Sequence, residues 1–203
     1  MSTWAIVVAA GRGERFGRPK QYELVAGRRV MDWSVDDAED ACDGVVVVVP
    51  ADRVEPGTVA GGATRSESVR NGLAAVPDDA DIIVVHDAAR PAAGVGLFTA
   101  VIDAVRAGAD AAIPGVPVTD TIKRVAGDVV VETVERSSLV AVQTPQAFRA
   151  SVLRDAHASG DDATDDAALV ERRGGKVVVV PGHAANRKIT EPGDIDALEA
   201  VLG

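Results

Sequence analysis

Residues 5–22 read AIVVAAGRGERFGRPKQY, an apolar run that ends in closely spaced glycines and basic side chains. A strand that runs into glycine allows backbone to approach a ligand closely, and the usual ligand of such a turn is a nucleotide phosphate. This stretch therefore predicts a strand, then a phosphate-binding loop, in an α/β fold.

Two familiar phosphate loops do not fit this stretch. The dinucleotide fingerprint G-x-G-x-x-G fails because Gly17 comes one residue late. The P-loop fails because Arg18 and Pro19 follow Gly17, and no Ser or Thr follows Lys20. The loop instead carries cations that suit a polyphosphate, Arg12, Arg15, Arg18 and Lys20. The alternative is a solvated basic loop.

Composition predicts one domain, residues 1–203, because 203 residues with 47% hydrophobic content can bury one sizeable core. The formal net charge of -10 argues against a nucleic-acid partner and makes local basic loops stand out. A single cysteine, Cys42, excludes an intramolecular disulfide. Neither a signal-peptide pattern nor an apolar run of membrane length is present, so we expect a cytoplasmic protein without a membrane partner.

Short apolar runs alternate with amphipathic segments along the chain. This alternation predicts a Rossmann-like, doubly wound α/β fold with a mostly parallel sheet, whose ligands lie beyond the carboxyl ends of the strands. We expect a cap at Thr164 for the last of the helices. The expected strands are 5–9, 45–49, 82–85 and 177–180, and the expected helices are 29–40, 66–75, 94–107, 147–158 and 165–173.

One segment interrupts this alternation. Residues 119–125 and 129–134 flank Gly127-Asp128, a two-residue signal for a β-hairpin. An apolar hairpin that leaves an α/β domain must be covered, commonly by a second copy of the chain. We expect a dimerisation arm at about 117–140; the alternative is a hairpin folded onto its own subunit.

Polar groups gather where the expected strands end. In IIVVHDAARP, Asp87 follows a strand, and it could bind a ribose hydroxyl or a metal-bound water. Arg90 could restrain Asp87 or bind phosphate. The alternative is a local Asp87-Arg90 pair that only orders the turn.

Two further segments complete the set of candidate binding groups. Gly61-Gly62 in GGATRSESVRNGL marks a second close approach of backbone, and Ser66 or Ser68 could contact a base or ribose, unless they are helix caps. Lys188 in NRKIT could bind a second anionic substrate, unless it is an unpaired surface lysine.

Seven blocks in order across nearly the whole chain resemble the 2-C-methyl-D-erythritol 4-phosphate cytidylyltransferases of the non-mevalonate isoprenoid pathway. They are AAGRGERFGRPKQY, GGATRSESVRNGL, HDAARP, VPVTDTIKR, ETVERSSLVAVQTPQAF, ATDDAALVE and NRKIT. The resemblance implies a nucleotide-diphospho-sugar-transferase-like fold. It also implies transfer of CMP from CTP to methylerythritol phosphate, with release of pyrophosphate.

The resemblance assigns roles to individual residues. The matching residues imply that Arg15 and Lys20 stabilise the pentavalent transition state, and that the arm exchanges between the subunits of a homodimer. Substrate positioning falls to Arg136, Lys188, Thr121 and Thr164. Nucleotide contacts fall to Ala9, Ala10, Gly11, Gly13, Gly61, Gly62, Ser68, Asp87, Ala88 and Arg90. Mg²⁺ is expected mainly on the triphosphate, with Asp87 as its candidate protein ligand.

Two departures bear on substrate fit rather than on the reaction. Val140 replaces a tryptophan common in the family, and Ala184-Ala185 replace more polar residues. Ribitol-5-phosphate cytidylyltransferases share much of this layout and are the main alternative. An NAD-type oxidoreductase and a nucleotide-binding module without turnover are the others. The late third glycine argues against the oxidoreductase, and cations for two anionic partners argue against the module.

Overall fold

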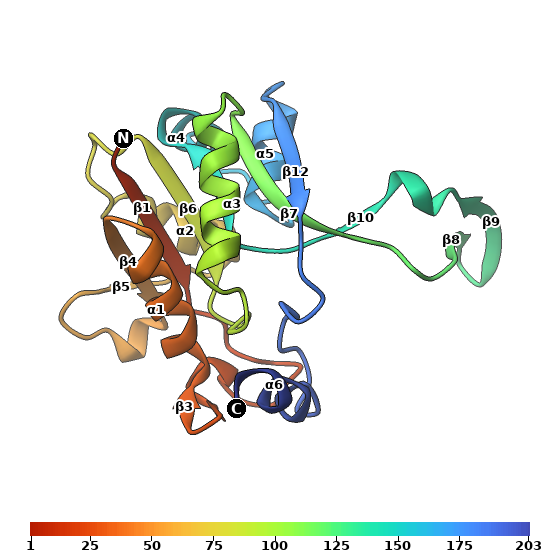
Figure 1. Ribbon diagram of the computed structural model, residues 1–203, viewed down its shortest axis with the longest axis horizontal. Coiled ribbons are helices and arrows are strands. Elements are labelled where there is room, and N and C mark those ends of the chain that lie inside the picture. Colours follow the sequence, from red (N-terminus) through yellow and green to blue (C-terminus); the bar gives the residue numbers. More distant parts are fainter.

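The computed structural model describes residues 1–203 and is built on a central eight-stranded sheet (Figure 1). Its strands are β1 (Thr3–Val8), β4 (Gly44–Val49), β5 (Thr58–Ala60), β6 (Ile82–Asp87), β7 (Ala111–Pro117), β10 (Val140–Val142), β11 (Gln146–Arg149) and β12 (Val177–Pro181). The order is β10-β7-β11-β6-β1-β4-β5, and β12 pairs with β7. Strands β10 and β11 are antiparallel to their neighbours, and the other pairs are parallel.

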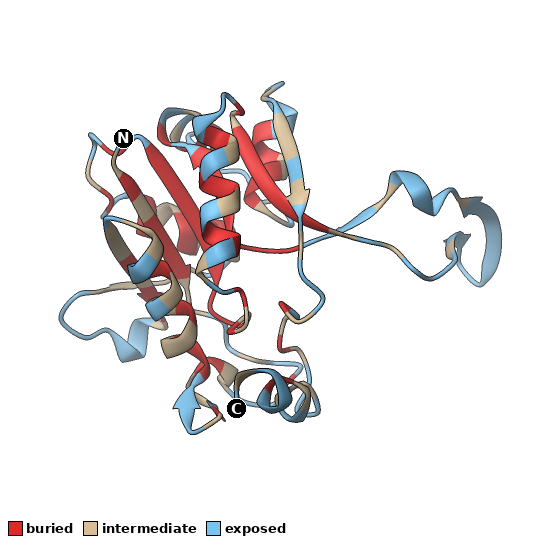
Figure 2. Cartoon of the chain, viewed as in Figure 1, coloured by how far each residue is buried: buried red, intermediate tan, exposed pale blue.

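Helices cover both faces of the sheet, so its central strands are buried on both sides. On one face, α1 (Val30–Ala41) and α3 (Val95–Arg106) pack over the sheet; on the other lie α2 (Arg65–Leu73), α4 (Ala150–His157) and α5 (Asp166–Arg172). All six residues of β6 are buried: the apolar run Ile82–Val85, as expected for a central strand, and also His86 and Asp87 at its end. Figure 2 shows this buried interior against an exposed periphery.

A third, smaller cluster lies below the carboxyl ends of the strands. There α6 (Asp194–Leu202) packs near the short hairpin of β2 (Leu24–Val25) and β3 (Arg28–Arg29). Its buried side chains are Phe16, Val25, Val30, Ile189 and Leu198. Because Phe16 lies in the glycine-rich loop and Ile189 follows Lys188, this cluster joins two of the predicted binding segments.

The expected hairpin is present and projects from the body as an arm (Figure 1). Strands β8 (Ile122–Ala126) and β9 (Val129–Val134) pair only with each other, and the 3-10 helix η3 (Arg136–Ser138) leads back to β10. Gly127 in the turn has a φ of +57°, as a two-residue hairpin turn requires. The first three valines of β9 are exposed on this single chain: Val129 by 66%, Val130 by 55% and Val131 by 56%.

The predicted doubly wound fold is confirmed, with two corrections in the elements. The expected helix 147–158 begins only at Ala150, because residues 146–149 form β11 between β6 and β7. The expected cap at Thr164 is wrong: Asp165 is the N-cap of α5, and its carboxylate accepts from the backbone N–H of Ala168 at 3.0 Å. Strand β7 and helix α6 were not expected.

None of the helices is both long enough and apolar enough to span a membrane.

Candidate active site

A cavity of about 420 Å³ lies at the carboxyl ends of β1 and β6. The loop after β1 lines one side, and residues 62–65 at the start of α2 line another. Asp87 closes the end of β6, and Lys188 comes from the segment that follows β12. This is the edge where doubly wound sheets place their ligands, and it brings together segments more than 100 residues apart.

The glycine-rich loop owes its path to Gly13. Its φ is +68°, and a Cβ there would lie 1.8 Å from the carbonyl oxygen of Arg18. Only glycine allows the loop to fold back on itself so tightly. Gln21 braces the same loop by donating from its side-chain amide to the carbonyl of Gly11 at 3.0 Å.

The cavity wall is positive although the protein is acidic. Cationic side chains outnumber carboxylates in its lining. The carboxylates are Glu14 and Asp87, and the cations are Arg12, Arg15, Lys20, Arg65 and Lys188. Arg18 is the exception among the loop cations, because it lies outside the cavity and pairs with Glu23 at 2.6 Å. A cavity of this charge is suited to a highly charged anion such as a nucleoside triphosphate.

Lys20 and Lys188 are held in place by neighbouring acceptors. The Lys20 ammonium donates to the carbonyl of Ile189, and the Lys188 ammonium pairs with Oδ2 of Asp87 at 2.6 Å. Burial lowers the pKa of Lys20, and the positive charges of Lys188 and Arg15 lower it further. An anionic ligand would relieve this mutual repulsion, so the arrangement favours anion binding.

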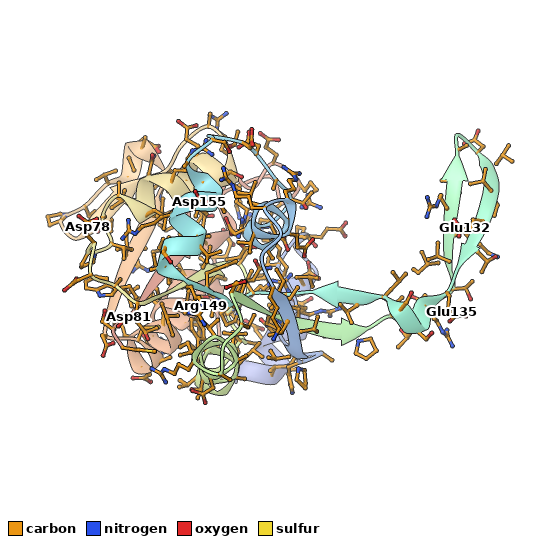
Figure 3. The ribbon with its side chains drawn as sticks, turned by 90° about the horizontal axis from the view of Figure 1, so that it is seen from above. Asp78, Asp81, Glu132, Glu135, Arg149 and Asp155 are labelled. Carbon is orange, nitrogen blue, oxygen red and sulfur yellow. The ribbon has the colours of Figure 1, made fainter.

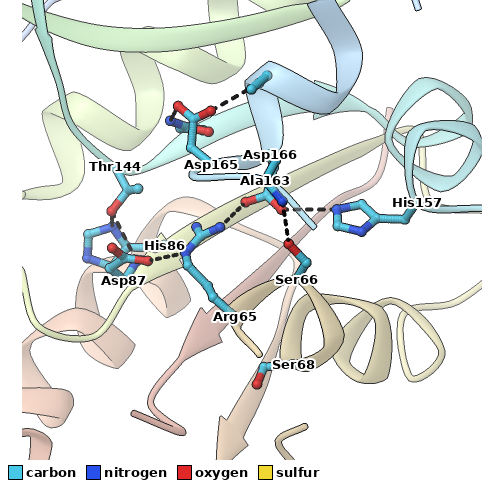
Figure 4. Close-up of polar contacts among 12 residues, drawn as sticks. Arg65, Ser66, Ser68, His86, Asp87, Thr144, His157, Ala163, Asp165 and Asp166 are labelled. Atoms are coloured by element: carbon cyan, nitrogen blue, oxygen red, sulfur yellow. Dashed lines mark hydrogen bonds and ion pairs between the residues drawn. The ribbon is translucent and has the colours of Figure 1, made fainter. Parts of the chain in front are cut away.

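Asp87 is a buried carboxylate with a cation on each oxygen. Its Oδ1 accepts from Nε of Arg65 at 3.0 Å (Figure 4). Its Oδ2 pairs with Lys188. Burial alone would raise the pKa of Asp87, but Arg65 and Lys188 hold it well below the usual range. Asp87 is therefore ionised at any physiological pH.

A hydrogen-bonded chain fixes the backbone of Asp87. Its N–H donates to the hydroxyl of Thr144 at 3.0 Å, and that hydroxyl lies 3.1 Å from Nδ1 of His86. Nε2 of His86 lies 3.3 Å from the carbonyl of Arg90, an acceptor, so the proton is on Nε2 and Nδ1 accepts from Thr144. Burial lowers the pKa of His86 to about 4, so its imidazole is neutral.

Of the Gly61-Gly62 pair, Gly62 lines the cavity and Gly61 does not. A Cβ on Gly61 would lie 2.2 Å from Cβ of Ala10, so glycine permits the two loops to touch. Ser68 lines the cavity, and its hydroxyl accepts from the N–H of Gly62 at 3.0 Å. Ser66 binds the α4–α5 connection instead, accepting from the N–H of Ala163. Neither serine is the cap, since Thr64 caps α2.

The expected pair of Asp87 with Arg90 is wrong. Arg90 does not line the cavity; its guanidinium donates to the carbonyl of Asn186 at 2.8 Å and to that of Val142 at 3.4 Å. Arg65 takes the place beside Asp87 that was expected for Arg90. Arg90 thus joins the base of the arm to the segment that carries Lys188, and its nucleotide contact stays a prediction.

Three predicted positioning residues lie outside the cavity of their own chain. Thr121 and Arg136 belong to the arm, where the Arg136 guanidinium donates to the carbonyl of Thr119. Figure 3 shows Glu132 and Glu135 on this projection, away from the body. Thr164 is exposed in the connection between α4 and α5. Of the four residues in this predicted group, only Lys188 lines the cavity.

Arg65 is the site residue that sequence reasoning missed. It lies at the first position of α2, where the helix dipole disfavours a cation. Such a cation must be compensated, and here Asp87 and Asp166 both bind it. The carboxylates overcome the lowering effect of burial and raise its pKa. An arginine directly after a threonine cap was the available signal.

The structure shows no cluster of several potential ligand side chains around one point. No group of three or more His, Cys, Asp or Glu side chains is placed to hold an ion. Both oxygens of Asp87 already bind cationic side chains, which argues against its expected role as a magnesium ligand.

Comparison with known proteins agrees with this geometry. The family model described as 2-C-methyl-D-erythritol 4-phosphate cytidylyltransferase (IspD) matches residues 3–203. The enzyme of that name from Saccharopolyspora erythraea is 47% identical, with all of both chains covered. The one from Rhodococcus jostii is also 47% identical, over 98% of this chain and 94% of that protein.

A longer relative and a solved structure extend the comparison. The bifunctional enzyme IspD/IspF of Solidesulfovibrio magneticus is 44% identical over 98% of this chain, which spans 56% of that protein's length. The crystal structure of the cytidylyltransferase from Thermus thermophilus superposes with a TM-score of 0.86 at 36% identity, covering 99% of this chain and 98% of that one. The chain belongs to the 2-C-methyl-D-erythritol 4-phosphate cytidylyltransferase family.

Proposed function

We propose that the protein transfers CMP from CTP to 2-C-methyl-D-erythritol 4-phosphate. An oxygen of the phosphomonoester attacks the α-phosphorus of CTP, the bond from that phosphorus to the bridging oxygen breaks, and pyrophosphate leaves. The observation that carries this proposal is the cluster of cations around one cavity in a protein of net charge -10. Because the reaction joins two anions, charge compensation and positioning supply most of the catalysis.

We propose separate roles for the cavity residues. Arg15 and Lys20 belong to the loop that would surround the triphosphate, and they stabilise the charge that grows at the reacting phosphorus. Lys188 lines the same cavity, close enough to Lys20 for its charge to lower the pKa of Lys20, and it orients the attacking phosphate. No nucleophilic side chain takes part, since the acceptor itself supplies the attacking oxygen.

We propose that magnesium arrives with CTP, bound to the triphosphate, as part of the substrate. The pairing of Asp87 with Arg65 and Lys188 supports this proposal, because both oxygens of this carboxylate are already occupied by cations. Glu14 is the other carboxylate in the cavity lining, and Mg²⁺ in such sites takes most of its oxygens from substrate phosphates and water.

We also propose a homodimer in which the arm of one chain reaches the cavity of the other. Two observations support it: the apolar residues of the arm are uncovered in the single chain, and Thr121 and Arg136 are remote from their own cavity. Packing of the arm on a partner would cover these apolar residues and could bring Thr121 and Arg136 to the partner's cavity.

We expect this enzyme to act in the cytoplasm, where CTP is available.

Pyrophosphate release tests the reaction. The protein is incubated with CTP and Mg²⁺, first with 2-C-methyl-D-erythritol 4-phosphate, then with ribitol 5-phosphate, and finally with no acceptor. We expect release only with the first acceptor, together with the diphosphocytidyl product. Pyrophosphate release with ribitol 5-phosphate but not with the first acceptor would show that ribitol 5-phosphate is the substrate. Binding of CTP without pyrophosphate release would show that the protein is a nucleotide-binding module.

A further inference from the structure

A line of polar and charged side chains runs from the interior of the protein to the cavity, and Figure 4 shows it from His157 to Asp87. At its inner end, Nε2 of His157 donates to Oδ1 of Asp166 at 3.0 Å. Nη1 of Arg65 donates to the other oxygen of Asp166 at 2.8 Å. Arg65 then binds Asp87, which binds Lys188 at the cavity.

Asp166 is the most deeply buried charge in this line. Its side chain is 1% exposed, whereas that of Arg65 is 24% exposed and that of Lys188 is 36% exposed. Burial alone would raise the pKa of Asp166, but Arg65 and His157 lower it, so the buried carboxylate is ionised. A buried charge of this kind is costly unless its partners stay in place, so Asp166 fixes Arg65 firmly.

The positive charge of Arg65 neutralises Asp87 only in part, because Arg65 also pairs with Asp166. Arg65 and Lys188 supply two positive charges, and Asp87 and Asp166 supply two negative charges. If Asp166 lost its charge, Arg65 would compensate Asp87 more completely. Asp87 would then attract Lys188 less, and the ammonium of Lys188 would be less well oriented.

We propose that Asp166 is a positioning residue for CMP transfer, which acts through Arg65 and Asp87 on Lys188. The inference rests on the proposed function, in which Lys188 orients the attacking phosphomonoester. Asp166 touches no substrate, since it is buried behind Arg65 and does not line the cavity. Because the proposed route ends at Lys188, its effect should fall more on the acceptor phosphate than on CTP.

Steady-state kinetics of Asp166→Asn test this assignment. We expect kcat/KM for the acceptor to fall roughly 10-fold, while the KM for CTP changes less than about twofold. The matched control is Asp155→Asn on α4, whose carboxylate is exposed and pairs with Arg173 at 3.0 Å. The control should retain wild-type kinetics. Equal losses toward both substrates would overturn the assignment.

A double-mutant cycle separates positioning from general structural damage. If Asp166 acts through Lys188, adding Asp166→Asn to Lys188→Met should cost less than about twofold beyond Lys188→Met alone. If the losses in kcat/KM of the two single variants multiply in the double variant, Asp166 acts by a route that does not include Lys188, and the proposal fails. The thermal unfolding midpoints of all variants are measured alongside, because a structural effect on stability persists in both backgrounds.

Histidine variants keep the proposal testable if Asp166→Asn does not fold. His157→Leu removes the donor to Asp166, whereas a glutamine at this position can present an amide N–H near Nε2. We expect His157→Leu to show a smaller loss in the same acceptor parameter and His157→Gln to recover most of it. Identical kinetics in the two variants would count against the line of charges.

A final measurement does not depend on turnover. The sequence has only four lysines, Lys20, Lys123, Lys176 and Lys188, so ¹³C-dimethylated lysines can be resolved by NMR and Lys188 identified by its loss in Lys188→Met. In the free protein, the Lys188 resonance should move in Asp166→Asn or His157→Leu, but not in Asp155→Asn. An unmoved resonance overturns the inference. A wild-type protein that releases no pyrophosphate refutes the proposed function instead.

Discussion

Lys20 and Arg18 lie two residues apart in one loop and have different surroundings. Lys20 lines the cavity, whereas Arg18 points away and binds Glu23. Lys20→Ala should lower kcat by about 100-fold, a loss of roughly 3 kcal/mol of transition-state stabilisation, because it removes charge at the reacting phosphorus. The KM for CTP should change less, and Lys20→Arg should restore only part of the rate because its shape and reach differ.

Arg18→Ala is the matched control for Lys20→Ala. It removes a cation from the same loop, but the pair that it breaks is exposed on the arginine side, where the side chain is 65% exposed. Exposed pairs contribute little to stability, so kcat should stay within about twofold of wild type. Near-normal turnover of Lys20→Ala at saturating CTP would contradict the catalytic assignment.

His86 makes stability depend on pH. The folded protein holds it neutral with a pKa of about 4, below the ordinary value of 6.5, so protonation favours the unfolded chain. The contribution of His86 to the free energy of unfolding is complete above pH 6.5. As the pH falls from 6.5 to 4, about 3 kcal/mol of this contribution is lost. Urea unfolding between pH 7 and pH 4 should show a weaker pH dependence for His86→Gln than for wild type.

The exposed histidine provides the control for that experiment. His183→Gln should keep the wild-type pH dependence, because this side chain is accessible to solvent. If His86→Gln lost stability with acid as steeply as wild type, another group would be responsible. The stability of each variant at pH 7 serves as the reference, since His86 also loses its bond from Thr144 on substitution.

Which single residues could be predicted from sequence depends on how local their surroundings are. Lys20 and Gly13 lie in a loop whose glycine spacing and charge are visible in the sequence, and both line the cavity. The partner of Asp87 was mistaken because Arg90 is three residues away in sequence, while Arg65 meets Asp87 only after β5, α2 and β6 pack together. Pairing between a helix and a strand distant in sequence depends on the fold and cannot be read from residue spacing.

At the scale of the loop, Gly13 and Gly17 make different demands. Both have positive φ, but a Cβ at Gly13 would strike the carbonyl of Arg18, whereas nothing lies within 4 Å of a Cβ at Gly17. Gly13→Ala must therefore move the loop and should lower kcat/KM for CTP by about 10-fold or more. Gly17→Ala meets only the strain of positive φ, on the order of 1 kcal/mol, and should retain most activity.

The same two variants need a thermal unfolding measurement beside the kinetics. The loop is mostly exposed, apart from the buried Phe16, so the midpoint should fall by only a few degrees in both. A Gly13→Ala variant as active as Gly17→Ala would show that the tight turn is dispensable. Global unfolding of either variant would show that the loop supports the third cluster more than the site.

The elements that sequence predicted best are those with strong periodicity or uniform composition. The valine-rich runs became β4 and β12, and helix α3 was found within a residue of its expected ends. Strand β7 was missed because its sequence, AAIPGVP, is poor in β-branched residues and contains two prolines. Strand β11 was merged into a helix because Gln146–Arg149 is too short to show a period.

At the scale of the whole molecule, charge is distributed unevenly. The net charge of -10 coexists with a cavity in which cations prevail. A surface of excess negative charge repels anions in general, whereas the cavity attracts them locally, so binding of CTP should weaken as salt screens the cavity field. Composition predicted this contrast, but only the fold shows that Lys188 and the glycine-rich loop share one cavity.

The arm links the shape of the molecule to its chemistry. Arg136 and Thr121 lie on a projection with no body of its own to pack against, and Val129, Val130 and Val131 are exposed on it. In a two-fold dimer, each arm can cover its apolar side on the partner and bring Arg136 to the partner's Lys20. Each active site would then contain residues from both chains.

Mixing two inactive variants tests whether the site is shared. A Lys20→Ala chain and an Arg136→Ala chain, exchanged at equal amounts, should form mixed dimers in which one of the two sites has both wild-type residues. About a quarter of wild-type activity should return, since half the dimers are mixed and half of their sites are intact. Subunit exchange is verified independently by native mass spectrometry, with the two variants carrying different tags. If exchange is complete and activity stays at the level of the separate variants, Arg136 and Lys20 act within one chain, and the arm must fold back onto its own cavity.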